Sequence, residues 1–242
     1  MAIFESGEVR LHYEISGSEA GEALPLLLFA PGGMRSAADL WARAPFDPRV
    51  ACADGRRVIA MDQRNAGAST APITAAQGWH TYAQDHVALL DHLGIERCLV
   101  MGMCIGGPFC LGLAQAAPAR VAAAVLLQPI GLDDNRDAFR QMYDAWADDL
   151  RPLRPEVDEA AWQGLRAQLF DGDFVFSVSR DFVRACAMPM LVARGDDLYH
   201  PASISEEIAR IAPDAQLLRD WKEDPGRETA VQQILAFLDR HG

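Results

Sequence analysis

The sequence of 242 residues lacks several features that would assign it to a class of protein. Its longest apolar runs, such as "LPLLLFA" and "VAAAVLL", are far shorter than the roughly 20 residues of a membrane-spanning helix. The first residues lack the basic region and apolar stretch of a signal peptide. No CxxC pair and no Cys/His cluster indicates a zinc site. We therefore expect a soluble, cytoplasmic protein without a metal.

Positive charge is also scarce, with 22 Lys and Arg residues against 34 Asp and Glu, for a formal net charge of −12. This balance argues against nucleic acid or an anionic membrane surface as partner. The five cysteines are odd in number and irregularly spaced, so we expect free thiols in a reducing compartment.

A small-molecule substrate without a cofactor is the simplest expectation. The sequence leaves the oligomeric state open, with a homodimer among the alternatives.

What the sequence does contain is an alternation of strand-like and helix-like segments. Apolar runs such as "PLLLFA", "RCLVMGM" and "AAAVLLQ" are typical of strands buried on both faces, and amphipathic segments lie between them. The alternation predicts an α/β fold with a mostly parallel central sheet and helices on both faces. In such a sheet the functional loops follow the carboxyl ends of the strands.

One segment interrupts this alternation. Between "LLQPIG" and "MPMLVARG", two amphipathic stretches flank the proline-rich "RPLRPEV". We interpret residues 132–187 as a small helical lid, inserted between the core segments 1–131 and 188–242. The alternative is an ordinary pair of connecting helices that covers nothing.

The stretch "VMGMCIGG", residues 100–107, has the strongest chemical pattern. Gly102 and Gly106 flank Cys104 at the end of a predicted strand and before a predicted helix, which favours a sharp turn that exposes the thiol. The helix N-terminus would lower the thiol pKa, and the N–H of Ile105 would be an oxyanion donor. The alternative is a glycine-rich turn around an incidental buried cysteine.

Several stretches together carry a resemblance to a known family. "FAPGGMRS", "MDQRNAGAST", "GMCIGG" and "GDDLYHP" resemble the oxyanion loop, the loop after the fourth strand, the nucleophile elbow and the acid loop of the α/β-hydrolase superfamily. The cysteine elbow is similar to that of dienelactone hydrolases, and the remainder is more similar to lidded esterases. The resemblance implies that Cys104 is the nucleophile and that Gly33 and Ile105 supply the oxyanion donors, with Met34 as a neighbouring candidate.

The same resemblance implies a triad acid. Asp197 matches it, because Pro201 follows four residues later. Asp196 is the second candidate, and Asp133 or Asp134 is a minor alternative.

The triad histidine does not follow from the resemblance. In the family it lies after the last strand, but that loop here reads "DWKEDPGRET". His86 and His92, on the helix before the elbow strand, are expected at the surface or its boundary. His200, three residues after Asp197, is the remaining candidate. It would either serve as the base from a new position, cap the following helix, or lie against the lid.

Three other residues are candidates for contact with the thiolate or the substrate. Trp221 and Lys222 occupy the loop that lacks the histidine, and a cationic Lys222 would favour the thiolate. Arg35 follows the oxyanion loop and would bind a substrate carboxylate, or would be a solvated loop residue.

These residues predict a hydrolase that attacks an ester, lactone or thioester with a cysteine. A thiolate can attack without a dedicated base, whereas hydrolysis of the resulting thioester needs activated water. Two alternatives stay open: a non-hydrolytic enzyme on the same fold, such as a lyase or acyltransferase, and a catalytically degenerate ligand-binding protein.

Overall fold

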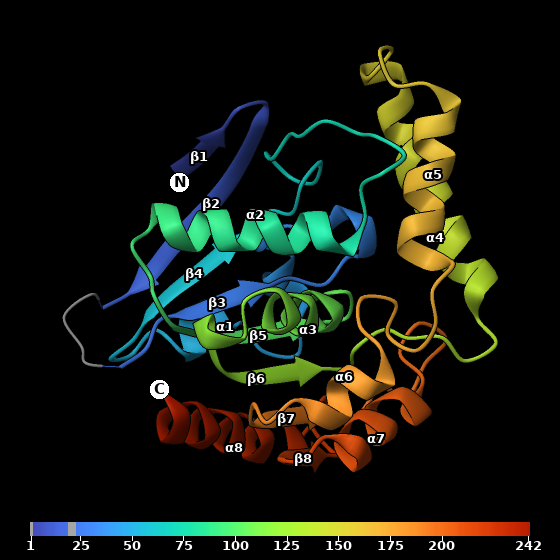
Figure 1. Cartoon of the computed structure of the whole chain (residues 1–242). Helices are drawn as coiled ribbons and strands as arrows, with labels where there is room; N and C mark the ends of the chain where they lie inside the picture. The colour runs from blue at the N-terminus through green and yellow to red at the C-terminus, as the bar shows by residue number, and fades with distance from the viewer. Residues whose placement is uncertain (1, 19–22) are drawn as a thin grey trace.

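The computed structural model describes residues 2–18 and 23–242, and the strands within them form one sheet of eight (Figure 1). The strand order is β1-β2-β4-β3-β5-β6-β7-β8; the pairs β1–β2 and β2–β4 are antiparallel and the others parallel. The predicted α/β fold with a mostly parallel sheet is confirmed. The strands are β1 (Ala2–Ser6), β2 (Val9–Gly17), β3 (Leu26–Phe29), β4 (Arg57–Met61), β5 (Cys98–Met103), β6 (Val121–Leu127), β7 (Met190–Ala193) and β8 (Ala215–Leu218).

Helices cover both faces of this sheet. The α-helices are α1 (Pro48–Ala51), α2 (Trp79–His92), α3 (Gly106–Ala116), α4 (Arg136–Leu150), α5 (Glu159–Phe170), α6 (Arg180–Ala185), α7 (Ala202–Ile211) and α8 (Gly226–His241). The 3-10 helices are η1 (Gly33–Arg35), η2 (Ala38–Arg43), η3 (Pro118–Arg120) and η4 (Arg151–Leu153). One core cluster joins α2, α3 and α7 to the sheet, and a second joins η2 and α8 to its opposite face. The central strands are therefore buried on both sides, which explains their unbroken apolar sequences.

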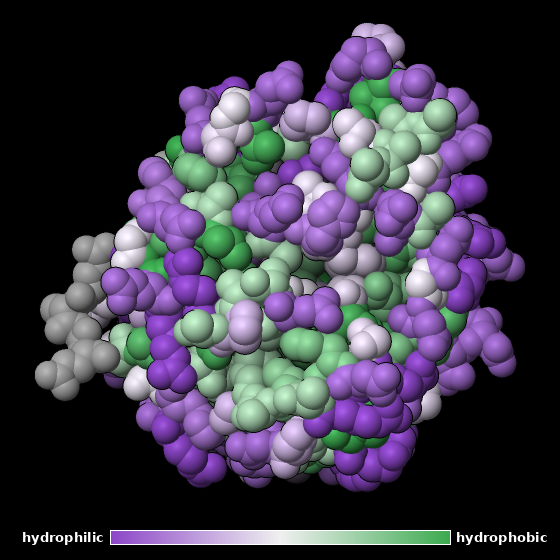
Figure 2. Space-filling model, viewed as in Figure 1, coloured by the Kyte–Doolittle hydropathy of each residue, from purple (hydrophilic) through white to green (hydrophobic). Residues whose placement is uncertain are grey.

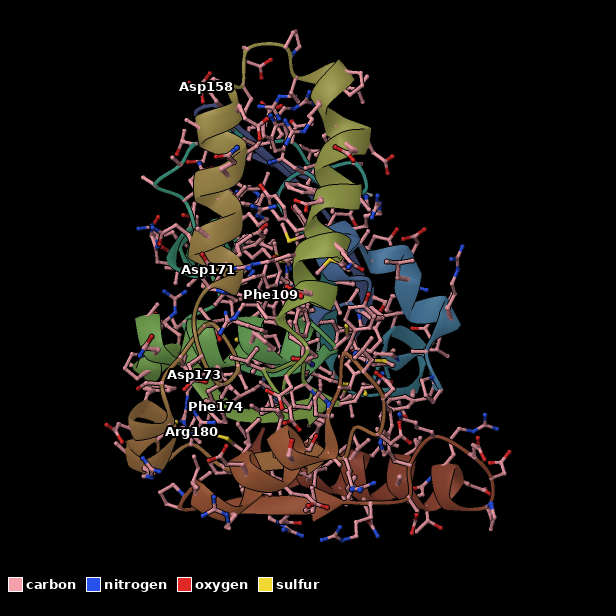
Figure 3. All side chains as sticks on the ribbon, turned by 90° about the vertical axis from the view of Figure 1, so that its right-hand side faces the viewer. Phe109, Asp158, Asp171, Asp173, Phe174 and Arg180 are labelled. Carbon is pink, nitrogen blue, oxygen red and sulfur yellow. The ribbon has the colours of Figure 1, made fainter. Side chains whose placement is uncertain are left out.

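The helices α4 and α5 come from the segment between β6 and β7. The arrows of β3 and β6 point toward this pair in Figure 1, so α4 and α5 lie beyond the carboxyl ends of the strands. Asp158 caps the start of α5 by accepting the N–H of Ala161 at 2.7 Å, and Asp171 marks its end (Figure 3). Both helices appear where the sequence predicts helices; that they act as a lid stays a prediction.

Aromatic side chains tie this helix pair together and to the core. Tyr143 on α4 donates to the carbonyl of Trp162 on α5 at 2.8 Å. Trp146 donates its indole N–H to the carbonyl of Asn65 in the β4 loop at 3.1 Å, and Trp79 donates to the carbonyl of Leu169 at 2.8 Å. The indoles of Trp79 and Trp146 thus keep a hydrogen-bond partner in the core, whereas the buried indole N–H of Trp41 has none among the described residues.

The expectation that His86 lies at the surface or its boundary is wrong. Its side chain is fully buried on the face of α2 that packs on the sheet, with Nε2 2.8 Å from Oε1 of Gln63. Its ring packs against that of Phe29 at a tilt of 35°, with centroids 4.3 Å apart. Burial, with a smaller contribution from Arg64, lowers the pKa of His86 to about 3, so its imidazole is neutral at ordinary pH.

Two kinds of feature are absent from the described part of the chain. None of its helices combines the length and the apolar character needed to cross a bilayer. Nor do three or more His, Cys, Asp or Glu side chains in residues 2–18 and 23–242 gather where they could hold a metal ion.

Apolar surface is concentrated in one region of the view in Figure 2. It lies in the lower centre, in the area of α3 and α6, while polar residues dominate the surrounding rim. A surface hollow of about 410 Å³ is lined there by residues that include Ala114, Phe182, Cys186 and Met188. Cys186 is partly exposed, and Cys52, Cys98 and Cys110 are buried.

Candidate active site

Cys104 lies in a sharp turn between β5 and α3. Its φ of +61° is in the left-handed region, a conformation that costs a non-glycine residue roughly 1–3 kcal/mol. A Cβ on Gly102 would lie 2.1 Å from the carbonyl oxygen of Gly106, and one on Gly106 would lie 2.2 Å from that of Phe29. The two glycines are therefore required by close backbone approach, and the turn has the shape that their spacing predicts.

The thiol of Cys104 is partly exposed and lies beside His200. Burial raises the pKa of Cys104, but the neighbouring imidazole of His200, with the N–H groups of Gly32 and Ile105, holds this pKa below its ordinary value. For His200, burial lowers the pKa, whereas Cys104 and Asp197 raise it, and the balance lies above the ordinary value. The opposite shifts of the two groups favour a thiolate beside an imidazolium.

Asp197 holds the other ring nitrogen of His200. Both of its carboxylate oxygens lie 2.8 Å from Nδ1, and Oδ1 also accepts the N–H groups of Tyr199 and His200 at 3.0 and 3.1 Å. Partial burial raises the pKa of Asp197, but the hydrogen bonds from His200 and the backbone N–H groups outweigh burial. The pKa of Asp197 therefore lies below its ordinary value. Nδ1 is engaged with Asp197, whereas Nε2 is buried without a hydrogen-bond partner among the described residues and is the nitrogen available to the thiol of Cys104.

The other candidate acids have different partners. Lys222 pairs with Asp196, and Ser203 donates its hydroxyl to Asp133 at 2.6 Å. Asp134 is exposed. The structure thus brings together Cys104, His200 and Asp197 and places the three alternative carboxylates elsewhere.

The topology explains how His200 reaches the thiol. His200 and Asp197 follow β7, whereas Cys104 follows β5, and β6 lies between these strands in the sheet. The loop after β7 must therefore cross the end of β6. Because Asp197 and His200 are only three residues apart, one loop supplies both the carboxylate and the imidazole.

The loop after β8 holds Trp221 and Lys222. Trp221 is buried in the core cluster against which Cys104 packs, and its indole N–H donates to the carbonyl of Arg194 at 2.8 Å. Lys222 lies over the Trp221 ring, with Nζ 5.8 Å from the centroid, and pairs with Asp196. The lowered pKa of Cys104 comes from His200 and backbone N–H groups, so Lys222 is not needed to explain it.

Of the expected oxyanion residues, Gly33 and Met34 lie in the turn after β3, and Ile105 lies at the start of α3. Gly32 and Gly33 have φ values of +114° and +58°, and the N–H of Gly32 helps to lower the pKa of Cys104. Gly32 was missed by the sequence reasoning, which assigned the donors to Gly33 and Ile105. Arg35 is exposed, as the solvated-loop alternative expects, and it donates to Asp149 and, at 2.8 Å, to the carbonyl of Ala145 on α4.

Gln128, in the loop after β6, has an unusual backbone conformation. It follows β6 directly, has a φ of +39°, and is 8% exposed. Its N–H donates to the carbonyl of Ala193 at 2.9 Å, while its Oε1 is buried without a hydrogen-bond partner among the described residues. A glutamine in the left-handed region has no local sequence signal, so only the fold reveals it.

Comparisons with known proteins identify the family of the fold. Residues 25–188 match the model of the alpha/beta hydrolase fold family. The chain is 38% identical over 119 residues to the putative carbamate hydrolase RutD of Variovorax paradoxus, covering 48% of this chain and 41% of that protein. It is 31% identical over 223 residues to the dihydrolipoyllysine-residue acetyltransferase component of the acetoin cleaving system of Pseudomonas putida, covering 79% and 58%.

Among solved structures, the esterase RhEst1 from Rhodococcus is similar with a TM-score of 0.69 at 22% identity, over 100% of both chains. The chain spans less than two thirds of the length of the two relatives above. The family match, by contrast, covers more than half of this chain. The chain therefore belongs to the α/β-hydrolase fold family.

Proposed function

We propose that this chain is a hydrolase that attacks the carbonyl carbon of an ester, lactone or thioester with Cys104. The observation that carries the proposal is the contact of the thiol with His200, whose Nδ1 lies 2.8 Å from Asp197. A nucleophile, a base and a group that orients the base are the three parts of a hydrolytic triad.

The first half of the reaction forms a thioester on Cys104. The thiolate attacks the carbonyl carbon, and the carbonyl electron pair moves to oxygen, where N–H groups from Ile105 and the Gly32–Gly33 turn would stabilise the oxyanion. The C–O or C–S bond to the leaving group then breaks as the carbonyl re-forms. The imidazolium of His200 donates its Nε2 proton to the leaving group.

The second half needs His200 as a base. Neutral His200 accepts a proton from water through Nε2, the hydroxide attacks the thioester, and the carboxylic acid leaves as Cys104 regains its thiolate. Asp197 keeps the imidazole oriented through Nδ1 and stabilises its charged form. Because the loop after β7 supplies His200 as a base, we favour hydrolysis over a stalled acyl-enzyme and over a binding protein.

The substrate would be a small molecule that enters beneath α4 and α5. We propose that residues 132–187 act as a lid over the site between the core segments 1–131 and 188–242, and that the buried aromatic side chains of this lid exclude water. The names of relatives include both a carbamate hydrolase and an acetyltransferase component, so transfer to a second acceptor is the alternative to test.

The test is release of p-nitrophenolate from p-nitrophenyl acetate by wild type, Cys104→Ala and Cys186→Ala. Cys186 is the matched control because it is the other partly exposed cysteine. We expect release by wild type and by Cys186→Ala and none above background by Cys104→Ala. Equal release by all three proteins would contradict the proposal. Release that requires an added thiol or amine acceptor would favour acyl transfer instead.

A further inference from the structure

A single side chain of α4, that of Met142, covers the turn expected to bind the oxyanion. Its Sδ accepts a hydrogen bond from the N–H of Met34 at 3.5 Å. A Cβ built on Gly33 would lie 2.6 Å from Sδ, 3.2 Å from Cγ and 3.4 Å from Cε of Met142. The whole tip of the thioether therefore packs directly against Gly33.

This contact lies next to the nucleophile. The N–H of Gly32, the neighbour of Gly33, helps to lower the pKa of the Cys104 thiol. A carbonyl carbon attacked by Cys104, with its oxygen on this turn, must therefore lie close to the tip of Met142. Any group attached to that carbon has to fit against the thioether or displace it.

A second contact fixes α4 over the same turn. Arg35, at the end of η1, donates to the carbonyl of Ala145 at 2.8 Å and pairs with Asp149. The side chains of Arg35 and Asp149 are 46% and 70% exposed, so this ion pair alone contributes little to stability. Its geometric effect is to keep the face of α4 that carries Met142 against the turn.

We propose that Met142 is the specificity-determining residue of this site and restricts it to substrates with short acyl groups. The inference rests on the proposed function, since it concerns the acyl group that Cys104 receives. A methionine side chain has three rotatable bonds and adapts to a small group at little cost. A long acyl chain, in contrast, needs the volume that the thioether occupies.

The first test compares p-nitrophenyl acetate with p-nitrophenyl octanoate in wild type, Met142→Ala and Gln141→Ala. Gln141 is the neighbouring exposed residue on α4 and serves as the matched control. We expect Met142→Ala to raise the octanoate-to-acetate ratio of kcat/KM by about tenfold or more, which is the effect of a few methylene groups in a pocket. Gln141→Ala should leave the ratio unchanged.

A second variant keeps the test valid if the alanine variant fails to fold. Met142→Leu has a similar volume but fewer rotatable bonds, so we expect it to lower the same ratio. Melting temperatures establish that each variant is folded. An unchanged ratio in folded Met142→Ala, or in folded Met142→Leu when the alanine variant is unfolded, would overturn the inference.

A thiol-labelling experiment separates failure of this inference from failure of the proposed function. Iodoacetamide and a bulky maleimide are reacted with each protein, and peptide mapping gives the rates at Cys104 and at Cys186 as internal reference. We expect Met142→Ala to accelerate the maleimide selectively at Cys104. If no protein hydrolyses esters but this acceleration is seen, the proposed hydrolase is wrong while the role of Met142 in limiting access stands. The inference about Met142 is wrong if esters are hydrolysed but Met142→Ala changes neither the octanoate-to-acetate ratio of kcat/KM nor the maleimide-to-iodoacetamide ratio of labelling rates at Cys104.

Discussion

Replacement of His200 by glutamine tests the role that we propose for this residue in the two halves of the reaction. Glutamine keeps much of the volume of the side chain but cannot take up a proton. Burial raises the pKa of Cys104, and the partner that chiefly offsets burial is His200, so the variant should hold less thiolate. General acid–base catalysis contributes about 10²–10⁴-fold, and we expect steady-state ester hydrolysis to fall by a factor in that range.

The two halves should not be affected equally. A cysteine retains some nucleophilicity without a base, whereas water does not attack a thioester readily unless it loses a proton. The variant should therefore accumulate acyl-enzyme and release p-nitrophenolate in a burst that matches the enzyme concentration, followed by slow turnover. Stopped-flow absorbance measures both phases.

The matched control is His80→Gln, which makes the same substitution at an exposed histidine of α2. It should behave as wild type. Asp197→Asn keeps the imidazole and should reduce turnover less than His200→Gln. Wild-type turnover in His200→Gln would refute the assignment of the base.

Three further predictions concern the elbow and the core. Alkylation of Cys104 by iodoacetamide should persist below the pH range of an ordinary thiol and decline only as pH falls through the lowered pKa of Cys104, as a rate profile against pH would show. Gly106→Ala should destabilise the fold by roughly 1–3 kcal/mol in guanidinium unfolding, because the added methyl meets a backbone carbonyl that cannot easily move. Asp85→Asn should lower the free energy of unfolding by about 3–5 kcal/mol in the same assay, since it leaves the buried Arg64 without its bidentate partner at 2.7 and 2.9 Å. Replacement of both Asp85 and Arg64 by apolar residues should lower it far less.

The strands of the sheet centre could be predicted because burial on both faces leaves an unbroken apolar sequence. β1 was missed because its residues are only partly buried or exposed, so its sequence has no such run. His86 was misplaced because a histidine within a helix gives no sign of which face packs on the sheet. Fold class therefore follows from local patterns, while the burial of one polar side chain depends on distant contacts.

The candidate site, too, has parts that local sequence predicts and parts that depend on distant contacts. The glycines around Cys104 encode a local turn, and the spacing of Asp197 and His200 places both in one loop. Neither pattern shows that this loop crosses the end of β6 to reach the thiol. The partners of Arg35 and Met142 lie more than 100 positions away in sequence, so these contacts had no local signal.

The most direct measurement is the identity of the acylated residue. The protein is mixed with p-nitrophenyl acetate, quenched in acid within the first turnovers, and analysed by intact-mass spectrometry and peptide mapping, with His200→Gln alongside. We expect one acetyl group on Cys104, transient in wild type and persistent in the variant. An acetyl group found on another residue, or ester hydrolysis without any adduct on Cys104 in His200→Gln, would contradict this expectation.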